Sequence, residues 1–148
     1  MVYTDFSKAF DRVDHYTLLN KLRVIGFDSC SVELFGSYLN GREQFVFYNG
    51  YRSSNYTATS GVPQGSNLGP LLFNLFINDL PELINCKCLL FADDLKIFYQ
   101  VESVQDCHFL QRQLNILEDW CTDNKLDLNV SKCKICTCLL YTSDAADD

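Results

Sequence analysis

Hydrophobic and polar positions along the chain alternate between the two-residue period of strands and the longer period of helices. Residues 2–6 are an apolar and β-branched run that predicts a strand. Residues 15–25 predict an amphipathic helix, which Gly26 ends. The side chains that set its helical spacing are Leu18, Leu22 and Ile25.

A second helix and a hairpin are expected next. The helix starts from an N-cap at Ser29 or Ser31, ends at Asn40-Gly41 and has one apolar face. Residues 43–48 and 51–58 are rich in aromatic and β-branched side chains. They are joined by Asn49-Gly50, the strongest short-range signal of a β-hairpin, which we expect to be partly exposed. The apolar face of the second helix consists of Val32, Phe35 and Leu39.

A loop with three glycines and two prolines occupies residues 60–70 and runs into an apolar helix predicted over residues 71–79. Glycine lets the backbone approach another group closely, and a helix N-terminus offers unpaired N–H groups to a phosphate. An ordinary loop before a helix is the alternative interpretation. The density of Gly, Pro and Gln directly before a fully apolar helix favours a functional loop.

Two adjacent carboxylates, Asp93 and Asp94, lie between apolar runs in residues 89–98. This pattern predicts two strands joined by a tight turn, which would hold both charges at the rim of the core. Unpaired carboxylates beside apolar strands are costly to desolvate, so a divalent cation is the favoured neighbour. Taken alone, the pattern also suits a simple Asp-rich turn.

The last part of the chain predicts a long helix and a final strand. Ser103 and Asp106 form a capping-box pattern at the start of a helix over residues 103–125, which would pack on the sheet. A closing strand is expected to reach Leu140. Residues 141–148 break the pattern, and we expect them to be disordered or encoded outside the natural gene.

Size and composition narrow the class of protein. With 148 residues and 47% hydrophobic content, the chain fits one domain with a sizeable core. No apolar run approaches the roughly 20 residues of a membrane helix, and there is no secretion signal, so we expect an intracellular protein without a membrane partner. The eight cysteines are unevenly spaced and are interpreted as reduced thiols. A net charge of −7 disfavours a free-standing nucleic-acid binder, unless basic segments lie outside this fragment.

Together these elements predict an α+β fold, with helices packed on one face of an antiparallel sheet. Such a sheet would bring Asp5, at the end of the first strand, next to Asp93 and Asp94. Three converging carboxylates suit two magnesium ions, which activate an attacking 3′ oxygen and stabilise a leaving pyrophosphate. On spacing alone, Asp11 and Asp14 are rival ligands that the pattern does not rank against Asp5.

Zinc and histidine chemistry are disfavoured. Cysteines cluster at residues 86–88 and 133–138 without a paired Cys-x-x-Cys arrangement, and strand positions i and i+2 do not converge on a tetrahedral centre. His15 and His108 have no neighbouring ligand pattern, so we interpret them as solvated or capping residues.

Four motifs in order closely resemble the palm of reverse transcriptases from non-LTR (LINE-type) retrotransposons. They are DFSKAFDRVDH at residues 5–15, SGVPQGSNLGPLLF at 60–73, FADD at 91–94 and LNVSKCK at 128–134. The resemblance covers about residues 2–138. It implies that residues 1–140 are a palm fragment, with the fingers before Met1 and the thumb after the last strand lying outside it.

The resemblance assigns roles to the first motif. Asp5 matches the first metal-binding carboxylate, and the carbonyl of Phe6 would join the second metal. Phe10 matches the bulky side chain under the incoming sugar. An aromatic ring there rejects a 2′-hydroxyl by sterics and desolvation and so selects deoxynucleotides, whereas a plain core aromatic is the alternative.

The later motifs receive roles in the same way. Gln64 and Gly65 match positions that border the nascent base pair and the template strand. Asp93 matches the second catalytic carboxylate, and Asp94 the less stringent third one. Lys132 matches the lysine proposed to donate a proton to the leaving pyrophosphate, with a solvated surface lysine as the alternative.

The resemblance implies an RNA-directed DNA polymerase that uses two Mg²⁺ ions, with Mn²⁺ as a substitute, and whose partners are an RNA template, a DNA primer and a dNTP. The family suggests a cytoplasmic ribonucleoprotein that also acts in the nucleus; the oligomeric state is left open. An inactive retrotransposon remnant, acting at most as a structural or interaction module, is the alternative function. An RNA-templated RNA polymerase is disfavoured by Phe10 and by FADD before an apolar strand. We expect the fragment alone to be inactive because its cleft would lack walls.

Overall fold

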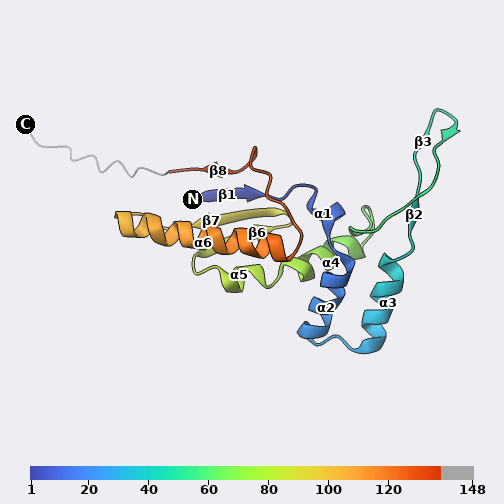
Figure 1. Cartoon of the computed structure of the whole chain (residues 1–148), viewed down its shortest axis with the longest axis horizontal. Coiled ribbons are helices and arrows are strands. Elements are labelled where there is room, and N and C mark those ends of the chain that lie inside the picture. The colour runs from blue at the N-terminus through green and yellow to red at the C-terminus, as the bar shows by residue number, and fades with distance from the viewer. Residues whose placement is uncertain (138–148) are drawn as a thin grey trace, which may run out of the picture.

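An antiparallel sheet of four strands, in the order β6-β7-β1-β8, forms one end of the molecule in the computed structural model, which describes residues 1–137 (Figure 1). The first strand of the sequence lies between β7 and β8, so residues from opposite ends of the chain meet at its sides. The sheet strands are β1 (Val2–Asp5), β6 (Lys87–Phe91), β7 (Asp94–Phe98) and β8 (Lys134–Ile135).

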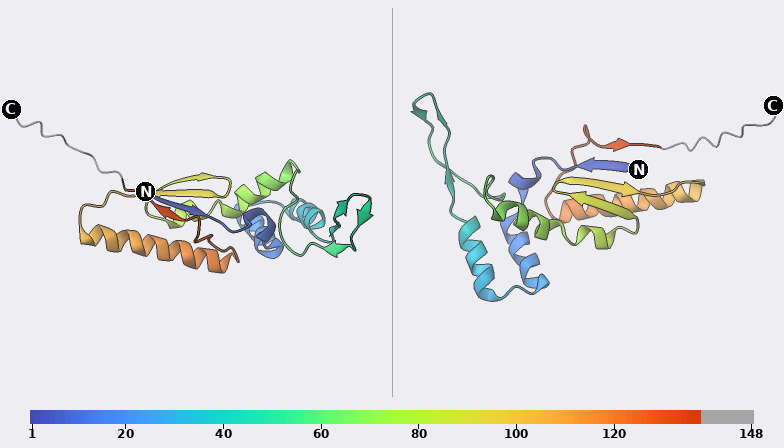
Figure 2. Two further views of the ribbon diagram at one scale, coloured as in Figure 1. Left: turned by 90° about the horizontal axis from the view of Figure 1, so that it is seen from above. Right: turned by 180° about the vertical axis from the view of Figure 1, so that it is seen from behind.

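One face of this sheet is covered and the other is open. The long helix α6 (Val104–Asp123) runs along the covered face, as two further views show (Figure 2). Strand residues of alternating position, such as Leu95 and Ile97, are fully buried there, whereas Leu89 and Phe91 on the other face are exposed. The arrangement confirms the expected antiparallel sheet with helices on one face.

A helical subdomain lies at the end of the sheet where β1 finishes. The helix α2 packs against both α3 and α4, and short α5 connects α4 to the sheet (Figure 1). A hairpin of four short strands projects from this subdomain. These elements are α1 (Ala9–Arg12), α2 (His15–Ile25), α3 (Ser29–Leu39), β2 (Glu43–Gln44), β3 (Phe47–Tyr48), β4 (Tyr51–Arg52), β5 (Tyr56–Thr57), α4 (Leu68–Ile77) and α5 (Leu80–Leu83).

Local signals explain several of the helix ends. Gly26 adopts a left-handed conformation at the C-terminus of α2, where its N–H bonds to carbonyls of the last turn. Ser103 and Asp106 form the predicted capping box of α6. The N-cap of α3 is Asp28, not Ser29 or Ser31, because its carboxylate accepts the N–H of Ser31.

The apolar helix α4 starts at Leu68 and not at the predicted Leu71. Pro70 looks like a loop residue in the sequence, but proline is tolerated in a first helical turn, where its missing N–H has no partner to lose. The helix ends at Ile77, before the predicted Asp79. The final strand is confirmed only as far as Ile135, and its predicted continuation beyond residue 137, like the tail at 141–148, lies outside the described residues.

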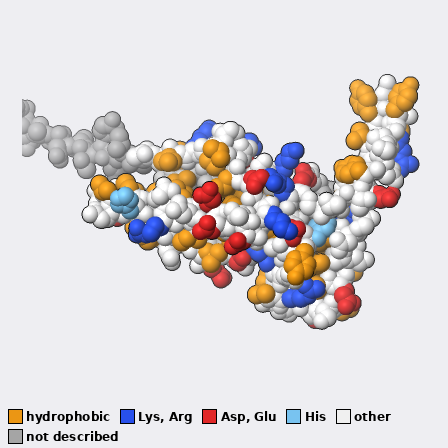
Figure 3. Space-filling view, viewed as in Figure 1, with side chains coloured by type: hydrophobic (Ala, Val, Ile, Leu, Met, Phe, Trp, Pro, Cys, Tyr) orange, Lys and Arg blue, Asp and Glu red, His pale blue; other side chains and the backbone are white. Residues whose placement is uncertain are grey.

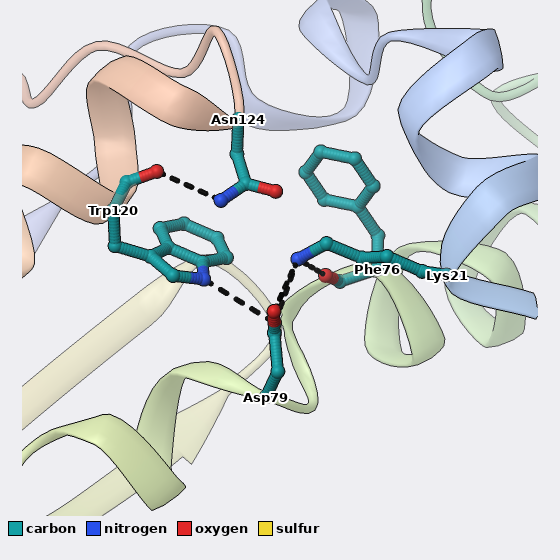
Figure 4. Close-up of polar contacts among 5 residues, drawn as sticks. All are labelled: Lys21, Phe76, Asp79, Trp120 and Asn124. Carbon is teal, nitrogen blue, oxygen red and sulfur yellow. Dashed lines mark hydrogen bonds and ion pairs between the residues drawn. The ribbon is translucent and has the colours of Figure 1, made fainter. Parts of the chain in front are cut away.

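A largely buried ammonium connects α2 to the α4–α5 junction and to α6, the helix that covers the sheet (Figure 4). Nζ of Lys21 on α2 donates to both carboxylate oxygens of Asp79, at 2.7 and 2.8 Å, and to the carbonyl of Phe76. It also lies 4.9 Å from the ring centroid of Phe76 and 4.7 Å from that of Trp120, whose indole N–H donates to Asp79. These contacts fix α2, the α4–α5 junction and α6 at one point.

Further observations concern thiols and membranes. The cysteines within residues 1–137 are free thiols, as expected; they are Cys30, Cys86, Cys88, Cys107, Cys121, Cys133 and Cys136. Across the same residues, none of the helices combines the length and apolar character that crossing a membrane requires.

Candidate active site

Asp5 and Asp94 face each other across the pairing of β1 with β7. Directly opposed residues of an antiparallel pair point to the same face of the sheet, with Cβ atoms about 4.5–5.5 Å apart. Both carboxylates therefore belong to the open face, and the predicted proximity of Asp5 and Asp94 is confirmed. Asp5 is 5% exposed, and its Oδ2 is buried without a hydrogen-bond partner among the described residues.

The turn between β6 and β7 carries Asp93. The residue before Asp93 is Ala92, whose φ of +52° is a left-handed conformation. A residue with a Cβ adopts this conformation at a cost of about 1 kcal/mol. Strain of this kind is concentrated at functional sites in proteins. Asp93 lies at the bend and not on the strand, so it is a neighbour of the Asp5–Asp94 pair and not a member of it.

The complete three-carboxylate cluster expected from the sequence is not formed in this structure. Within residues 1–137 there is no group of three His, Cys, Asp or Glu side chains placed to hold one metal ion. The rival ligands Asp11 and Asp14 are occupied elsewhere: Asp11 accepts a hydrogen bond from Gln64, and Asp14 caps α2. The acidic pair Asp5–Asp94, with Asp93 beside it, remains the best supported ligand set.

Tyr3 is the site residue that sequence reasoning missed. It lies two positions before Asp5 and so shares its face, and its hydroxyl donates a hydrogen bond to Oδ1 of Asp94. This bond raises the pKa of Tyr3 to about 12; burial and the negative charges of Asp94, Asp5 and Asp93 act in the same direction. All three carboxylates therefore act electrostatically on one hydroxyl. Strand alternation was the available signal.

Lys132 reaches Asp5 from the far end of the described chain. The segment before β8 runs beside β1, with the N–H of Asn129 bonded to the carbonyl of Asp5 at 2.7 Å. A turn in which Lys132 N–H bonds to the Asn129 carbonyl then places Nζ of Lys132 3.1 Å from Oδ2 of Asp5. The lysine side chain is largely exposed, so its ammonium borders both solvent and the buried carboxylate.

Phe6 and Phe10 occupy two different environments. Phe6 is buried against Trp120, with ring centroids 6.2 Å apart, and forms an isolated bridge to Leu128. Phe10 is half-buried and stacks on Phe73 of α4 with ring centroids 4.4 Å apart. It also borders a hollow of about 380 Å³, whose lining includes Phe91 and Ala92 of the FADD motif. Phe10 is thus both a packing residue and a wall of that hollow.

The glycine-rich loop is anchored to the first motif. Gly61 donates its N–H to the carbonyl of Val13, and at a φ of +82° an added Cβ would lie 2.7 Å from the carbonyl oxygen of Asp11. The close approach predicted for this loop is therefore made to the chain itself at Gly61. Gln64 donates to Oδ1 of Asp11 at 2.7 Å, whereas Gly65, also at positive φ, has open space around it.

His15 contributes to the same anchor, contrary to its interpretation as a solvated or capping residue. It is buried, and its Nε2 bonds to the carbonyl of Gly61 at 2.8 Å. The other ring nitrogen lies 3.3 Å from Oδ1 of Asn40 at the end of α3. No local pattern in the sequence signals a bond that joins α2 to a loop so distant along the chain.

Comparison with known proteins agrees with this geometry. Residues 1–145 match the family model described as Reverse transcriptase (RNA-dependent DNA polymerase). The chain belongs to the reverse transcriptase family. Similar curated proteins of this family come from mobile elements, which confirms the resemblance to non-LTR retrotransposons.

Two of these relatives define how much of a reverse transcriptase the chain represents. The RNA-directed DNA polymerase from mobile element jockey of Drosophila funebris is 31% identical over 140 residues. The probable RNA-directed DNA polymerase from transposon BS of Drosophila melanogaster is 34% identical over 144 residues. Each match covers 88% of this chain and 15% of the relative, so the chain spans less than a fifth of their length.

A solved structure supports the fold of this reverse transcriptase family chain. Apo telomerase from Candida tropicalis, truncated from its C-terminal domain, is similar with a TM-score of 0.64. The match covers 90% of this chain and 29% of the telomerase chain at 14% sequence identity, so it bears on the fold alone.

Proposed function

We propose that this chain is the catalytic palm of an RNA-directed DNA polymerase that adds deoxynucleotides to a DNA primer along an RNA template during retrotransposition. The observation that carries the proposal is the register of β1 and β7, which sets Asp5 opposite Asp94 in a reverse transcriptase family chain. Nucleotidyl transfer requires fixed negative charge at one point of a rigid scaffold, and two strands in register supply it.

Reverse transcriptases generally use divalent metal ions, and the residues present fit such ions. The buried Oδ2 of Asp5 accepts no hydrogen bond and has the largely exposed ammonium of Lys132 as an ion-pair partner at 3.1 Å. Asp94 and Asp93 add further carboxylate oxygens, the ligands that hard cations prefer. We propose two Mg²⁺ ions, replaceable by Mn²⁺, held by Asp5, Asp93, Asp94 and the carbonyl of Phe6. When bound, the ions would stabilise negative charge on the attacking and leaving oxygens. Their binding would have to draw Asp93 toward the Asp5–Asp94 pair.

Residues around the carboxylates would orient the substrates. The half-buried ring of Phe10 forms a wall of the hollow beside the FADD turn, where it would exclude a 2′-hydroxyl. Gln64 and the open backbone at Gly65 would border the template base. Lys132, whose ammonium is exposed on one side, would donate a proton to the leaving pyrophosphate.

A segment exchange tests the proposal. The chain replaces the matching segment of the jockey polymerase, and dTTP incorporation is measured on a poly(rA) template with an oligo(dT) primer in the presence of Mg²⁺. The exchanged enzyme is expected to extend the primer, and Asp5→Asn or Asp94→Asn is expected to abolish extension. Asp119→Asn, a matched change on the exposed surface of α6, should leave extension unchanged.

The inactive-remnant alternative predicts a different result. A folded exchange protein that binds primer and template but extends nothing would favour it. Extension that survives Asp5→Asn would instead refute the site.

A further inference from the structure

A projecting hairpin extends from the helical subdomain, away from the sheet (Figures 1 and 2). We name residues 43–57 the aromatic arm. Its strands pair as β2 with β5 and β3 with β4, and the tip turns at Asn49 and Gly50, both at positive φ. Positive φ at both central residues gives the primed turn typical of tight hairpins. The strand pairing therefore fixes the positions of the arm's side chains, which lie outside the core.

Aromatic rings cover both faces of the arm. Tyr48 and Tyr51 are direct partners across β3 and β4 and are 79% and 80% exposed. On the opposite face, Phe47 pairs with Arg52, and the guanidinium of Arg52 lies 4.0 Å from the ring centroid of Phe45. Hydrophobic side chains follow the whole projection, with basic atoms beside them (Figure 3). So many exposed rings on one element indicate a binding surface.

The aromatic arm is neutral overall, in contrast to the acidic chain, because its charged residues are Glu43 at the base and Arg52 near the tip. The protein carries a net charge of −7, yet Arg52 is the only charged residue between Glu43 and Asp79. The tip of the arm and the glycine-rich loop at residues 60–70 thus contain no carboxylate that would repel a polyanion. Aromatic rings with an adjacent guanidinium are the composition of sites that bind single-stranded nucleic acid by stacking.

The base of the arm is fixed to the candidate active site. Arg42 donates to the carbonyl of Gly61 at 2.9 Å and to that of Leu39 at 3.1 Å, and its own carbonyl accepts the N–H of Ala58. Gly61 begins the loop that contains Gln64 and Gly65. A nucleic-acid strand that borders this loop would therefore reach the aromatic arm next.

We propose that the aromatic arm binds single-stranded nucleic acid by stacking its bases on Tyr48, Tyr51 and the Phe45–Arg52–Phe47 face. Resting on the proposed function, the bound strand is the unpaired RNA template near the active site. Stacking needs only the face of a base, so the arm would hold template of any sequence.

The experiment measures binding separately from polymerisation. The 148-residue chain is titrated at low ionic strength into a fluorescein-labelled 12-nucleotide oligo(U) and into an abasic strand of the same length and charge, and anisotropy gives both dissociation constants. Variants are Tyr48→Leu/Tyr51→Leu, which keeps apolar surface without rings, and Tyr48→Phe/Tyr51→Phe, which keeps the rings. Tyr16→Ala removes an exposed ring from α2 as a matched control. Circular dichroism verifies that each variant is folded.

We expect tighter binding of oligo(U) than of the abasic strand, and a loss of about fivefold per ring in the leucine variant. The phenylalanine variant and Tyr16→Ala should stay within twofold of the unmodified chain. Equal affinity for the two strands, no binding by the unmodified chain, or full affinity of the leucine variant would overturn the proposal, the last because the strand would then bind without the tyrosine rings. Asp5→Asn should bind normally, so failure of this proposal is distinguishable from failure of the polymerase assignment.

Discussion

The ammonium of Lys132 lies 3.1 Å from Oδ2 of Asp5, a buried carboxylate oxygen that accepts no hydrogen bond within residues 1–137. The contact joins the first and last motifs of the chain across the edge of the sheet. It leaves the lysine exposed enough to meet a substrate while its charge balances Asp5. A group placed in this way is suited to proton transfer as well as to charge neutralisation.

Replacing Lys132 tests which of these tasks dominates. In the active exchange enzyme, Lys132→Met is expected to slow primer extension about 100-fold, the lower end of what a general acid contributes. Lys132→Arg keeps the positive charge but is a poor proton donor, so it should also be slow while primer and template binding is retained. Single-turnover extension rates measure this. Lys134→Met, on exposed β8, is the control, and an equal effect of both methionine variants would exclude a specific role.

Gly61 and Gly65 form a matched pair in the glycine-rich loop. Both have positive φ, but only at Gly61 would a Cβ collide with backbone, 2.7 Å from the Asp11 oxygen. Gly61→Ala should therefore displace the loop and lower the free energy of unfolding by several kcal/mol, whereas Gly65→Ala should cost about 1 kcal/mol from its φ alone. Urea unfolding measures both. Equal costs would mean that the loop moves freely away from Asp11.

The hollow beside Phe10 makes a prediction about sugar selection. Phe10→Ala should enlarge the hollow and raise incorporation of rUTP relative to dTTP in the exchange enzyme at least tenfold. The same change removes the stacking on Phe73 and should cost about 3 kcal/mol of stability. Phe73→Leu perturbs the same packing without opening the hollow directly. If selection is relaxed in both variants, the effect comes from packing, and Phe10 does not select the sugar directly.

The sequence predicts those parts of the fold that depend on local chemistry. Helix α2 has the predicted bounds because apolar spacing, a capping aspartate and Gly26 agree. The facing of Asp5 and Asp94 follows from strand order and alternation. By contrast, the bonds of Tyr3 to Asp94 and of His15 to Gly61 join residues far apart in sequence. Periodicity within a segment can place Tyr3 on the same face as Asp5, but it does not identify the bonding partner of Tyr3 or of His15.

The start of α4 shows a different limit. Glycine and proline normally indicate a loop, yet Gly69 lies in the first turn of α4. This position is a glycine because a Cβ there would lie 2.6 Å from the carbonyl oxygen of Pro63. Its presence reflects tertiary crowding, which composition alone does not separate from flexibility.

Asp14 predicts a pH dependence of stability. Burial acts to raise the pKa of this carboxyl, but hydrogen bonds from Lys125 and Thr17 outweigh it and lower the pKa to about 2. A carboxyl with a depressed pKa stabilises the fold above its ordinary value of 3.8, and that contribution is lost as the pH falls toward 2. Asp14→Asn keeps an N-cap but loses the charge.

We expect Asp14→Asn to lower the free energy of unfolding by about 1–2 kcal/mol at pH 7, allowing for partial solvent screening, with the difference shrinking below pH 4. Urea unfolding at a series of pH values measures it. Asp28→Asn alters the matching cap of α3, whose carboxylate bonds to Ser31, and should have a smaller effect. A constant difference across pH would contradict the ion pair with Lys125.

The Lys21–Asp79 pair offers a sharper test of buried charge, because its two partners differ in exposure: 16% for the lysine side chain and 48% for the aspartate. Burial lowers the pKa of Lys21, and the bonds to Asp79 oppose that shift. Asp79→Ala leaves the ammonium beside two aromatic rings without its counter-ion, which should cost about 2 kcal/mol. Lys21→Met/Asp79→Ala removes the stranded charge and should recover most of that loss.

The two variants also differ in their response to pH. Without Asp79, the pKa of Lys21 in the folded state should fall further below that of the unfolded chain. Between these two pKa values the unfolded state binds more protons, so the stability of Asp79→Ala should rise with pH toward 10.5, while that of the double variant should not. Fluorescence of Trp120, the only tryptophan, and circular dichroism together follow unfolding in urea. Parallel pH profiles for the two variants would show that α2 and α6 are held by packing and not by the ion pair.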